Sequence, residues 1–310
     1  MDIVSLLNAA IQSGTPLLFA TLGEIMTEKS GNLNLGVEGM MLVGAVVGFK
    51  VGLLTGNPII SLFGAAAAGA LAALIFAFLT VTLKANQVVT GLSLTILGTG
   101  FSSFAGKTLV GEIASDTIRE FFKPLIIPGI GNIPFIGEVL FHHDVFVYLG
   151  YVTAITLGIY LYHTRKGLNL RMVGENPWAA DASGINVGLY KYVHILMGGA
   201  LCGLGGAYLS LVYVPAWQEN VTAGRGWIAV ALVIFATWSP YKALIGSYLF
   251  GGLDIIGFRL QKFDMKISQY LIDMLPYIVT ILVLIVVSTK KSKDNMPPKG
   301  LGTPYFREER

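Results

Sequence analysis

Several apolar runs in this chain are long enough to cross a bilayer as helices, and they constrain the fold more than any other feature. About 18 or more apolar residues in a helix span about 30 Å of hydrocarbon. The composition agrees, because 54% of the 310 residues are hydrophobic, only 13% are charged and the mean hydropathy is +0.69. In a soluble domain, about a quarter of the residues are charged. We therefore expect an all-α, polytopic transmembrane helix bundle.

The hydrophobic pattern predicts eight to ten membrane spans. The two short spans 227–238 and 244–257 are separated by only five residues, so they form either a broken helix or a tight hairpin. The transmembrane domain then covers residues 1–288, and residues 289–310 form a C-terminal tail. The predicted spans are 3–22, 37–54, 59–83, 88–110, 145–162, 192–214, 227–238, 244–257 and 270–287.

Basic residues predict the orientation of the chain. Lys84, the group between Arg165 and Arg171, Lys242 and the tail lysines fall on one side if the spans alternate. The excess of Lys and Arg on the inner side of membrane proteins makes that side cytoplasmic. Five basic residues fall on the opposite side and weaken the pattern, namely Arg119, Lys123, Arg259, Lys262 and Lys266. The expected location is the cytoplasmic membrane. The net charge of +3 is small and says nothing about nucleic acid, and no nucleic-acid partner is expected.

One polar interval, residues 167–188, interrupts the apolar pattern on the cytoplasmic side. Pro177 suits the first turn of a short helix that Asn176 caps, and Gly184 suits its end. Ala179 and Ala180 between them allow close approach of another surface. The interval is therefore predicted to be a short helix presented to something outside the lipid, and a plain surface loop is the alternative.

A second polar run, residues 24–39, lies between two apolar segments. Charged groups at membrane depth are tolerated where they line a cavity or pair inside protein. Asn34 and Glu38 are four residues apart and would share one face at the start of a helix. The alternative is a cytoplasmic loop with solvated charges. The candidate pathway residues in this run are Glu24, Asn32, Asn34 and Glu38.

The sequence contains no convincing catalytic or metal-binding motif. The glycine that a phosphate-binding loop requires five residues before Gly106 is replaced by Phe101. His142 and His143 are adjacent, and neighbouring histidines on a loop do not converge on a metal without further ligands. Cys202 is the lone cysteine and lies in an apolar run, which excludes a disulfide framework. No catalytic residue, no bound metal and no cofactor are expected in this chain.

Three segments together resemble the permease subunits of bacterial ABC importers of the branched-chain amino acid and ribose superfamily. They match the nucleoside-importer branch best, and they read GEIMTEKSGNLNLGVEGMMLVGA, RMVGENPWAADASGINV and GRGWIAVALVIFATWSP. The resemblance extends over residues 15–287. It implies a type II-like ABC importer permease that takes up nucleosides, with a substrate-binding lipoprotein of the basic-membrane-protein type outside the membrane.

The resemblance also implies partners and site residues. ATP and magnesium would bind a separate ATP-binding subunit, and a second, related permease would complete a heterodimer in the lipid bilayer. The interval 167–188 would be the coupling helix that docks on the ATP-binding subunit. The residues that match the coupling pattern are Gly174, Glu175, Asn176, Ala179, Ala180 and Gly184.

Aromatic and amide residues suggest where the external mouth of a pathway lies. Trp217 and Asn220 would offer a ring face and hydrogen bonds to a neutral nucleoside, and an interfacial aromatic belt is the alternative. A sugar or a branched-chain amino acid would fit the same helices. An ion-coupled secondary transporter would use intramembrane acids, for which Asp254 and Asp273 are candidates.

Overall fold

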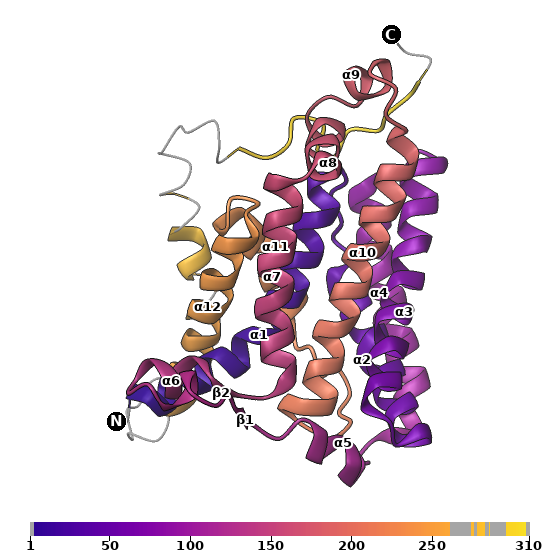
Figure 1. Cartoon of the computed structure of the whole chain (residues 1–310). Helices are drawn as coiled ribbons and strands as arrows, with labels where there is room; N and C mark the ends of the chain where they lie inside the picture. The colour runs from indigo at the N-terminus through magenta and orange to yellow at the C-terminus, as the bar shows by residue number, and fades with distance from the viewer. Residues whose placement is uncertain (1–2, 261–273, 276–277, 283–284, 286–295, 308–310) are drawn as a thin grey trace.

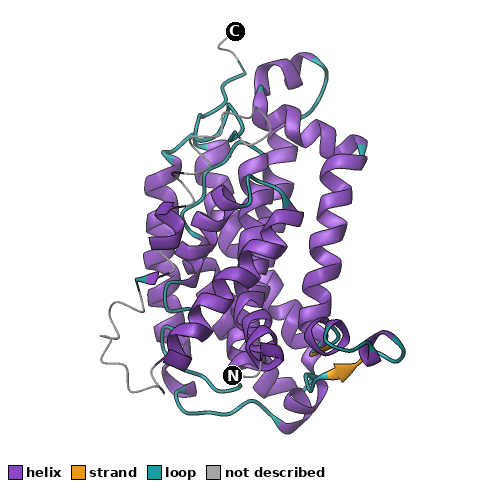
Figure 2. Cartoon of the chain, turned by 90° about the vertical axis from the view of Figure 1, so that its left-hand side faces the viewer, coloured by secondary structure: helices purple, strands orange, loops and turns teal. Residues whose placement is uncertain are grey.

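The computed structural model is a bundle of helices that run roughly along one axis, with a short two-stranded antiparallel sheet at one end (Figures 1 and 2). It describes residues 3–260, 274–275, 278–282, 285 and 296–307. The predicted span 270–287 falls largely outside the described residues. The long helices confirm the all-α prediction.

The helices and strands occur along the chain in the following order. The N-terminal half contains α1 (Ile3–Lys29), α2 (Val37–Thr55), α3 (Pro58–Ala77) with a π-helical turn (Phe78–Thr82), α4 (Gln87–Gly106) with a 3-10 turn (Lys107–Leu109), α5 (Asp116–Phe121), β1 (Leu125–Ile126), a 3-10 turn (Ile130–Asn132), α6 (Ile136–Leu140) and β2 (His142–His143). The remainder contains α7 (Val145–His163), α8 (Arg165–Glu175), α9 (Pro177–Ala182), α10 (Val187–Tyr208) with a π-helical turn (Leu209–Tyr213), α11 (Arg225–Phe235) and α12 (Pro240–Leu260).

Six of these helices are long and apolar enough to cross a membrane, in the part of the chain that the structure describes. They are α1, α2, α3, α4, α7 and α10, the last of which continues to Tyr213. α11 is apolar but has only 11 residues, whereas α12 has 21 residues and is therefore longer than the predicted short span 244–257. The turn between them contains Thr237 and Trp238, both at positive φ, so the two form a tight hairpin.

The first helix differs most from its predicted boundary. α1 continues to Lys29, seven residues beyond the expected end of the span at residue 22. The polar residues of this extension are buried inside the bundle, with Glu24 at 0% and Glu28 at 2% exposure. The alternative of a loop with solvated charges is therefore wrong, because these carboxylates have partners inside protein.

Glycines allow the central helices to touch backbone to backbone. A Cβ added at Gly44 of α2 would overlap Gly203 of α10, and one at Gly69 of α3 would overlap the carbonyl oxygen of Gly199. In lipid, where apolar side chains gain little from leaving the solvent, close approach at small residues holds helices together. α2 and α10 are the most buried spans, and α3 and α4 lie at the periphery.

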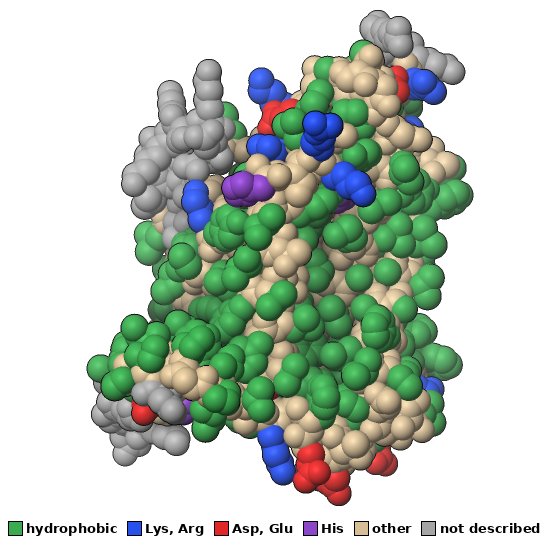
Figure 3. Space-filling view, viewed as in Figure 1, with side chains coloured by type: hydrophobic (Ala, Val, Ile, Leu, Met, Phe, Trp, Pro, Cys, Tyr) green, Lys and Arg blue, Asp and Glu red, His purple; other side chains and the backbone are tan. Residues whose placement is uncertain are grey.

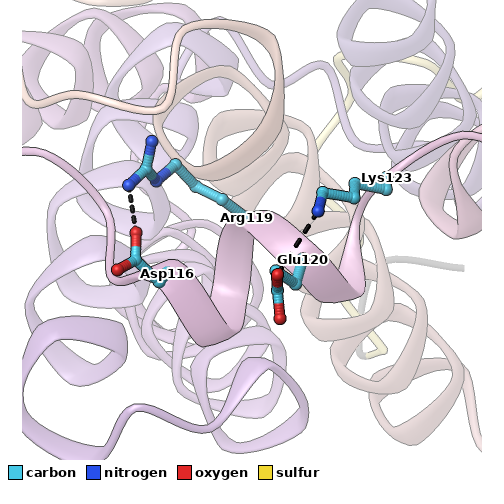
Figure 4. A network of polar contacts seen from close by, with 4 residues as sticks. All are labelled: Asp116, Arg119, Glu120 and Lys123. Carbon is cyan, nitrogen blue, oxygen red and sulfur yellow. Dashed lines mark hydrogen bonds and ion pairs between the residues drawn. The ribbon is translucent and has the colours of Figure 1, made fainter.

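The two ends of the bundle differ in charge. The described C-terminal residues, α8 and α9 share one end, where Lys and Arg side chains gather (Figures 1 and 3). At the opposite end lie the N-terminus and α5, and there Arg119 pairs with Asp116 while the Lys123 ammonium lies 3.3 Å from Glu120 (Figure 4). Two of the basic residues that weaken the predicted orientation, Arg119 and Lys123, are thus paired with acidic neighbours, whereas Lys262 and Lys266 lie outside the described residues.

Candidate functional site

The polar interval 167–188 folds into two short helices that meet at a sharp corner. α8 ends at Glu175, and α9 begins directly after Asn176 with Pro177 in its first turn. The Asn176 side-chain oxygen accepts the Ala179 N–H at 3.0 Å, which is the predicted cap. Gly184 has φ +81° and donates its N–H to Asp181, so it ends α9 as predicted.

The six residues of the predicted coupling pattern divide between the surface and the interior. Glu175, Asn176, Ala179 and Gly184 are exposed at the end of the bundle. Gly174 is buried, and a Cβ there would overlap the carbonyl oxygen of Lys29 at the end of α1. Ala180 is also buried, in a small cluster with Val173 of α8 and Val187 of α10. The segment therefore presents one exposed face and packs its other face on α1, α8 and α10.

Glu38 holds the beginning of a half-length helix. Its carboxylate accepts the Thr222 hydroxyl at 2.5 Å, the Gly224 N–H at 2.9 Å and the Gly226 N–H at 2.6 Å. These donors precede α11 or lie in its first turn, where N–H groups have no partner within the helix. A negative charge at a helix N-terminus is also favoured by the helix dipole.

The junction between Glu38 and α11 lies inside the bundle. α2 begins beside Leu94, since a Cβ at Gly36 would lie 2.8 Å from the Leu94 side chain. Leu94 is seven residues into α4, or about 10 Å from its first residue at about 1.5 Å per residue. With 11 residues, α11 is about 16 Å long and cannot cross about 30 Å of hydrocarbon. α11 is thus a broken helix in a different sense from the one expected, because it does not continue into α12 but begins within the membrane domain.

Glu24 and the asparagines shape the loop that leads to Glu38. The Asn34 N–H donates to Glu24 at 3.0 Å, and the Asn34 side-chain oxygen accepts the Gly36 N–H at 2.9 Å. Asn32 lies in the same loop, and its side-chain oxygen is 3.4 Å from the Ser30 hydroxyl. Because α2 begins only at Val37, Asn34 lies outside the helix. The prediction that Asn34 and Glu38 share a helical face is therefore wrong.

A second carboxylate of α1 holds the other end of α11. Glu28 accepts a hydrogen bond from the indole N–H of Trp238, which is buried in the turn after α11. Glu24 and Glu28, one helical turn apart on α1, thus bind the chain on either side of the Glu38 junction. The carboxylates that the sequence places in a polar run therefore accept hydrogen bonds in the folded protein, Glu24 from a backbone N–H and Glu28 from the side chain of a turn residue.

Trp217 and Asn220 do not form the predicted pair at a mouth. Trp217 is 1% exposed and packs on Phe49, with ring centroids 5.9 Å apart, and against Gly106. An interfacial aromatic belt does not describe it either, because its ring faces the protein interior. Asn220 is exposed and has φ +52° in the segment between the π-helical turn and α11.

Sequence reasoning missed Arg225, the first residue of α11. Its guanidinium lies 3.6 Å from the Asp254 carboxylate of α12 and 5.8 Å from the centre of the Tyr213 ring. The Ser13 hydroxyl of α1 donates to the same Asp254 at 3.3 Å. An arginine between a polar segment and an apolar run was a usable signal, because intramembrane charges mark functional positions. Asp254, a candidate for ion coupling, is here the partner of an arginine.

In the described part of the chain, no three His, Cys, Asp or Glu side chains gather as metal ligands would. His143, next to His142, donates its Nε2–H to the Val139 carbonyl oxygen at 2.7 Å, and burial lowers the pKa of its imidazole. Asp144 caps α7 by accepting the Phe146 and Val147 N–H groups, and its burial raises the pKa of the carboxyl. The hydrogen bonds of His143 Nε2 and of Asp144 Oδ1 thus go to the local backbone rather than to a metal ion.

The chain is similar to known permeases over most of its length. It is 42% identical to the "Putative glucose ABC transporter permease protein TsgC13" of Haloferax volcanii, over 85% of this chain and 80% of that protein. It is 35% identical to the guanosine ABC transporter permease protein NupQ of Bacillus subtilis, and 32% identical to the nucleoside ABC transporter permease protein NupC of Lactococcus lactis. Both of these matches cover 100% of each chain.

A family model described as the branched-chain amino acid transport system permease component matches residues 5–284. That range includes the α1 extension with its two carboxylates, the α8–α9 corner and the broken helix α11. The bundle of long apolar helices is what a permease of this kind requires. The chain belongs to the family of branched-chain amino acid transport system permease components, and it is a multi-pass membrane protein that serves as a transport permease subunit.

Proposed function

We propose that this chain is the membrane-spanning permease subunit of an ATP-driven importer that takes up nucleosides across a bacterial cytoplasmic membrane. The observation that carries the proposal is the broken helix α11, whose N-terminus is held inside the bundle by Glu38. In transporters, discontinuous helices lie where the backbone lines a substrate passage. Nucleosides are proposed because NupQ and NupC, named for guanosine and nucleosides, match along their whole length.

The proposed pathway follows the break before α11. Asn220 and the partly exposed Trp227 lie on either side of the break and would contact the solute. Glu38 would act by holding the break in place rather than by binding the solute, and Glu24 with Asn32, Asn34 and Trp217 would shape the walls around it. This division follows from burial, because the latter four side chains are at most 1% exposed.

The proposed partner on the α9 side is a separate ATP-binding subunit that carries ATP and magnesium. α9 is suited to docking because its exposed side carries the small residues Ala179 and Gly184, which allow another surface to approach closely. The helix is also fixed at both ends, by the Asn176 cap and by the turn at Gly184. A second, related permease and an extracytoplasmic substrate-binding lipoprotein would complete the complex.

Substrate binding to the partner lipoprotein tests the substrate class. Radiolabelled guanosine should bind it and should be displaced by other nucleosides but not by glucose. Glucose is the necessary competitor because TsgC13, the relative at 42% identity, is named for glucose. If glucose binds and every nucleoside fails, the nucleoside assignment falls and a sugar importer remains.

Uptake by a bulky variant of α9 tests the docking role. Ala179→Trp should abolish ATP-driven uptake in membrane vesicles while the protein still inserts, because Ala179 is exposed on the proposed docking face. Thr55→Trp is the matched control, since Thr55 is exposed at the opposite end of the bundle. A bulky residue at buried Ala180 would instead disturb the packing of α9 on α8. Normal uptake by Ala179→Trp would argue against docking at α9.

A further inference from the structure

The described C-terminal residues, 296–307, run along α8 and α9 rather than away from the bundle (Figure 1). Pro298 and Gly300 are buried beneath the corner between α8 and α9. The Gly300 N–H donates to the Gly174 carbonyl oxygen at 2.9 Å, and a Cβ at Gly174 would lie 3.3 Å from Pro298. The first attachment of this segment is therefore to the end of α8, where α8 itself touches α1.

A second attachment holds α9. The Trp178 indole N–H donates to the Phe306 carbonyl oxygen at 3.2 Å, and the Trp178 ring lies edge to face with Tyr305 at 5.8 Å between centroids. The Arg307 guanidinium lies 3.4 Å from the Asp181 carboxylate. Three consecutive residues of the C-terminal segment thus contact two positions of a helix that has only six residues.

A third attachment ties the same segment to the turn between α3 and α4. The Lys84 ammonium lies 5.9 Å from the centre of the Tyr305 ring and 6.0 Å from that of Phe306, which is within the range of a cation–π contact. Partial burial lowers the pKa of this ammonium. The segment therefore bridges two parts of the bundle that are about 90 residues apart in sequence, Lys84 and α9.

A helix of six residues depends on such contacts. Isolated helices shorter than about 12 residues are marginal in water, so packing must hold α9 in place. Packing within the permease comes from Ala180, in the cluster with Val173 and Val187, and Tyr305 of the C-terminal segment joins that cluster. Without residues 298–307, α9 would lose the contacts of Trp178 and Asp181 and one side of its apolar support.

We propose that residues 298–307 form a strap that holds α9 in its docking orientation and contributes to the surface that meets a cytoplasmic ATP-binding subunit. Trp178 and Phe306, 37% and 38% exposed, present aromatic surface from the helix and from the strap at the same place. Partly exposed aromatic side chains of this kind are enriched where proteins bind one another. The inference rests on the proposed coupling role of α9.

The strap itself is tested by amide exchange, a measurement that needs no partner. The full chain is compared in detergent with a variant lacking residues 296–310 and with the point variant Trp178→Ala. Both variants should exchange the α9 amides about tenfold faster, the change that follows from losing about 1.4 kcal/mol of local stability. The amides of α3 near Asn57, at the opposite end, should be unchanged. Unaltered exchange of the α9 amides would overturn the proposal that residues 298–307 hold α9 in place.

The role of the strap in docking is tested in the assembled complex. Removal of residues 296–310 should weaken copurification of the ATP-binding subunit and abolish ATP-driven uptake. Removal of residues 308–310 alone, which leaves the strap complete, should preserve both. Full copurification and full uptake by the chain that lacks residues 296–310 would overturn the docking role. Failure of the unaltered chain to copurify with any ATP-binding subunit would instead refute the proposed function and leave the exchange result standing.

Discussion

Three carboxylates that the sequence places in one polar run act on three different backbone segments. Glu24 accepts the Asn34 N–H, Glu28 accepts the Trp238 indole, and Glu38 accepts the two backbone N–H groups near the start of α11. A buried charge is tolerated only where it is hydrogen-bonded or paired. At the scale of single residues, these acids fix the loop before α2 and both ends of the short helix.

The Glu38 junction gives a direct prediction. Glu38→Gln should lower the free energy of unfolding in detergent by about 2 kcal/mol, because the amide cannot replace both carboxylate oxygens toward three donors. A thermal melt followed by tryptophan fluorescence measures the change. Glu120→Gln is the control, since its pair with Lys123 is exposed and should contribute nothing measurable. Equal melting temperatures for the two variants would contradict the role of Glu38 in holding the start of α11.

At the scale of elements, helix ends and helix contacts decide where the short segments lie. α9 depends on its cap and on the C-terminal segment, while the long helices depend on glycine contacts that bring backbones together. α11 belongs to both groups, because a Cβ at Gly226 would lie 2.5 Å from the Glu38 Cα. The short helices near the proposed docking and pathway positions are thus held in place by contacts with other segments of the chain.

Two equivalent caps at opposite ends of the bundle allow a matched test of α9. Asn176 caps α9 and Asn57 caps α3, each through its side-chain oxygen. Replacing either by Ala should cost about 1 kcal/mol of local helix stability. Only Asn176→Ala should slow ATP-driven uptake, because only α9 lies on the proposed docking surface. Similar uptake by the two variants would count against a special role for the α9 cap.

The contact between α2 and α10 predicts a stability difference between two glycines. Gly44→Ala should destabilise the protein by about 2 kcal/mol, since the added Cβ would overlap Gly203 and the helices must move apart. Gly100→Ala on α4 is the control, because a Cβ there meets nothing within 4 Å. Melting temperatures in the same detergent compare them. A Gly44→Ala protein as stable as the control would show that α2 and α10 can separate without cost.

At the scale of the whole molecule, the bundle has one basic end with α8, α9 and the C-terminal segment and an opposite end with α5. A separate hollow of about 870 Å³ is lined by apolar side chains of α2, α3 and α4, which suits contact with lipid chains. Lys and Arg side chains gather at the end with α8 and α9, whereas Arg119 and Lys123 at the far end are paired with acidic neighbours. This distribution of basic charge favours a cytoplasmic position for α9.

Labelling of intact cells tests this orientation. Single cysteines at Ser183, after α9, and at Asp116, in α5, place one thiol at each end. An impermeant maleimide should label the Asp116→Cys protein and leave the Ser183→Cys protein unlabelled until the cells are opened. Cys202 is buried and should not react. Labelling of Ser183→Cys in intact cells would reverse the orientation and exclude a cytoplasmic docking role.

Local patterns determined much of the fold and part of the site. The apolar runs predicted the long helices, because a bilayer forces every spanning segment to satisfy its own backbone. Asn176, Pro177 and Gly184 predicted the start and end of α9, since caps and positive φ act within a few residues. The family resemblance, carried by the same segments, is confirmed by the match to residues 5–284.

Only the tertiary structure decided what the buried polar residues do. Glu38 and Gly226 are 188 positions apart in sequence, and Trp178 and Phe306 are 128 apart, so no local pattern pairs them. Burial of Trp217 and the extension of α1 to Lys29 likewise depend on distant partners that satisfy or cover them. The sequence by itself determined a membrane helix bundle of a permease family, because spanning and capping are local. The position of α11 and the contacts of residues 298–307 with α8 and α9 were decided by interactions between distant residues, because a buried polar group is stable only where the fold supplies its partner.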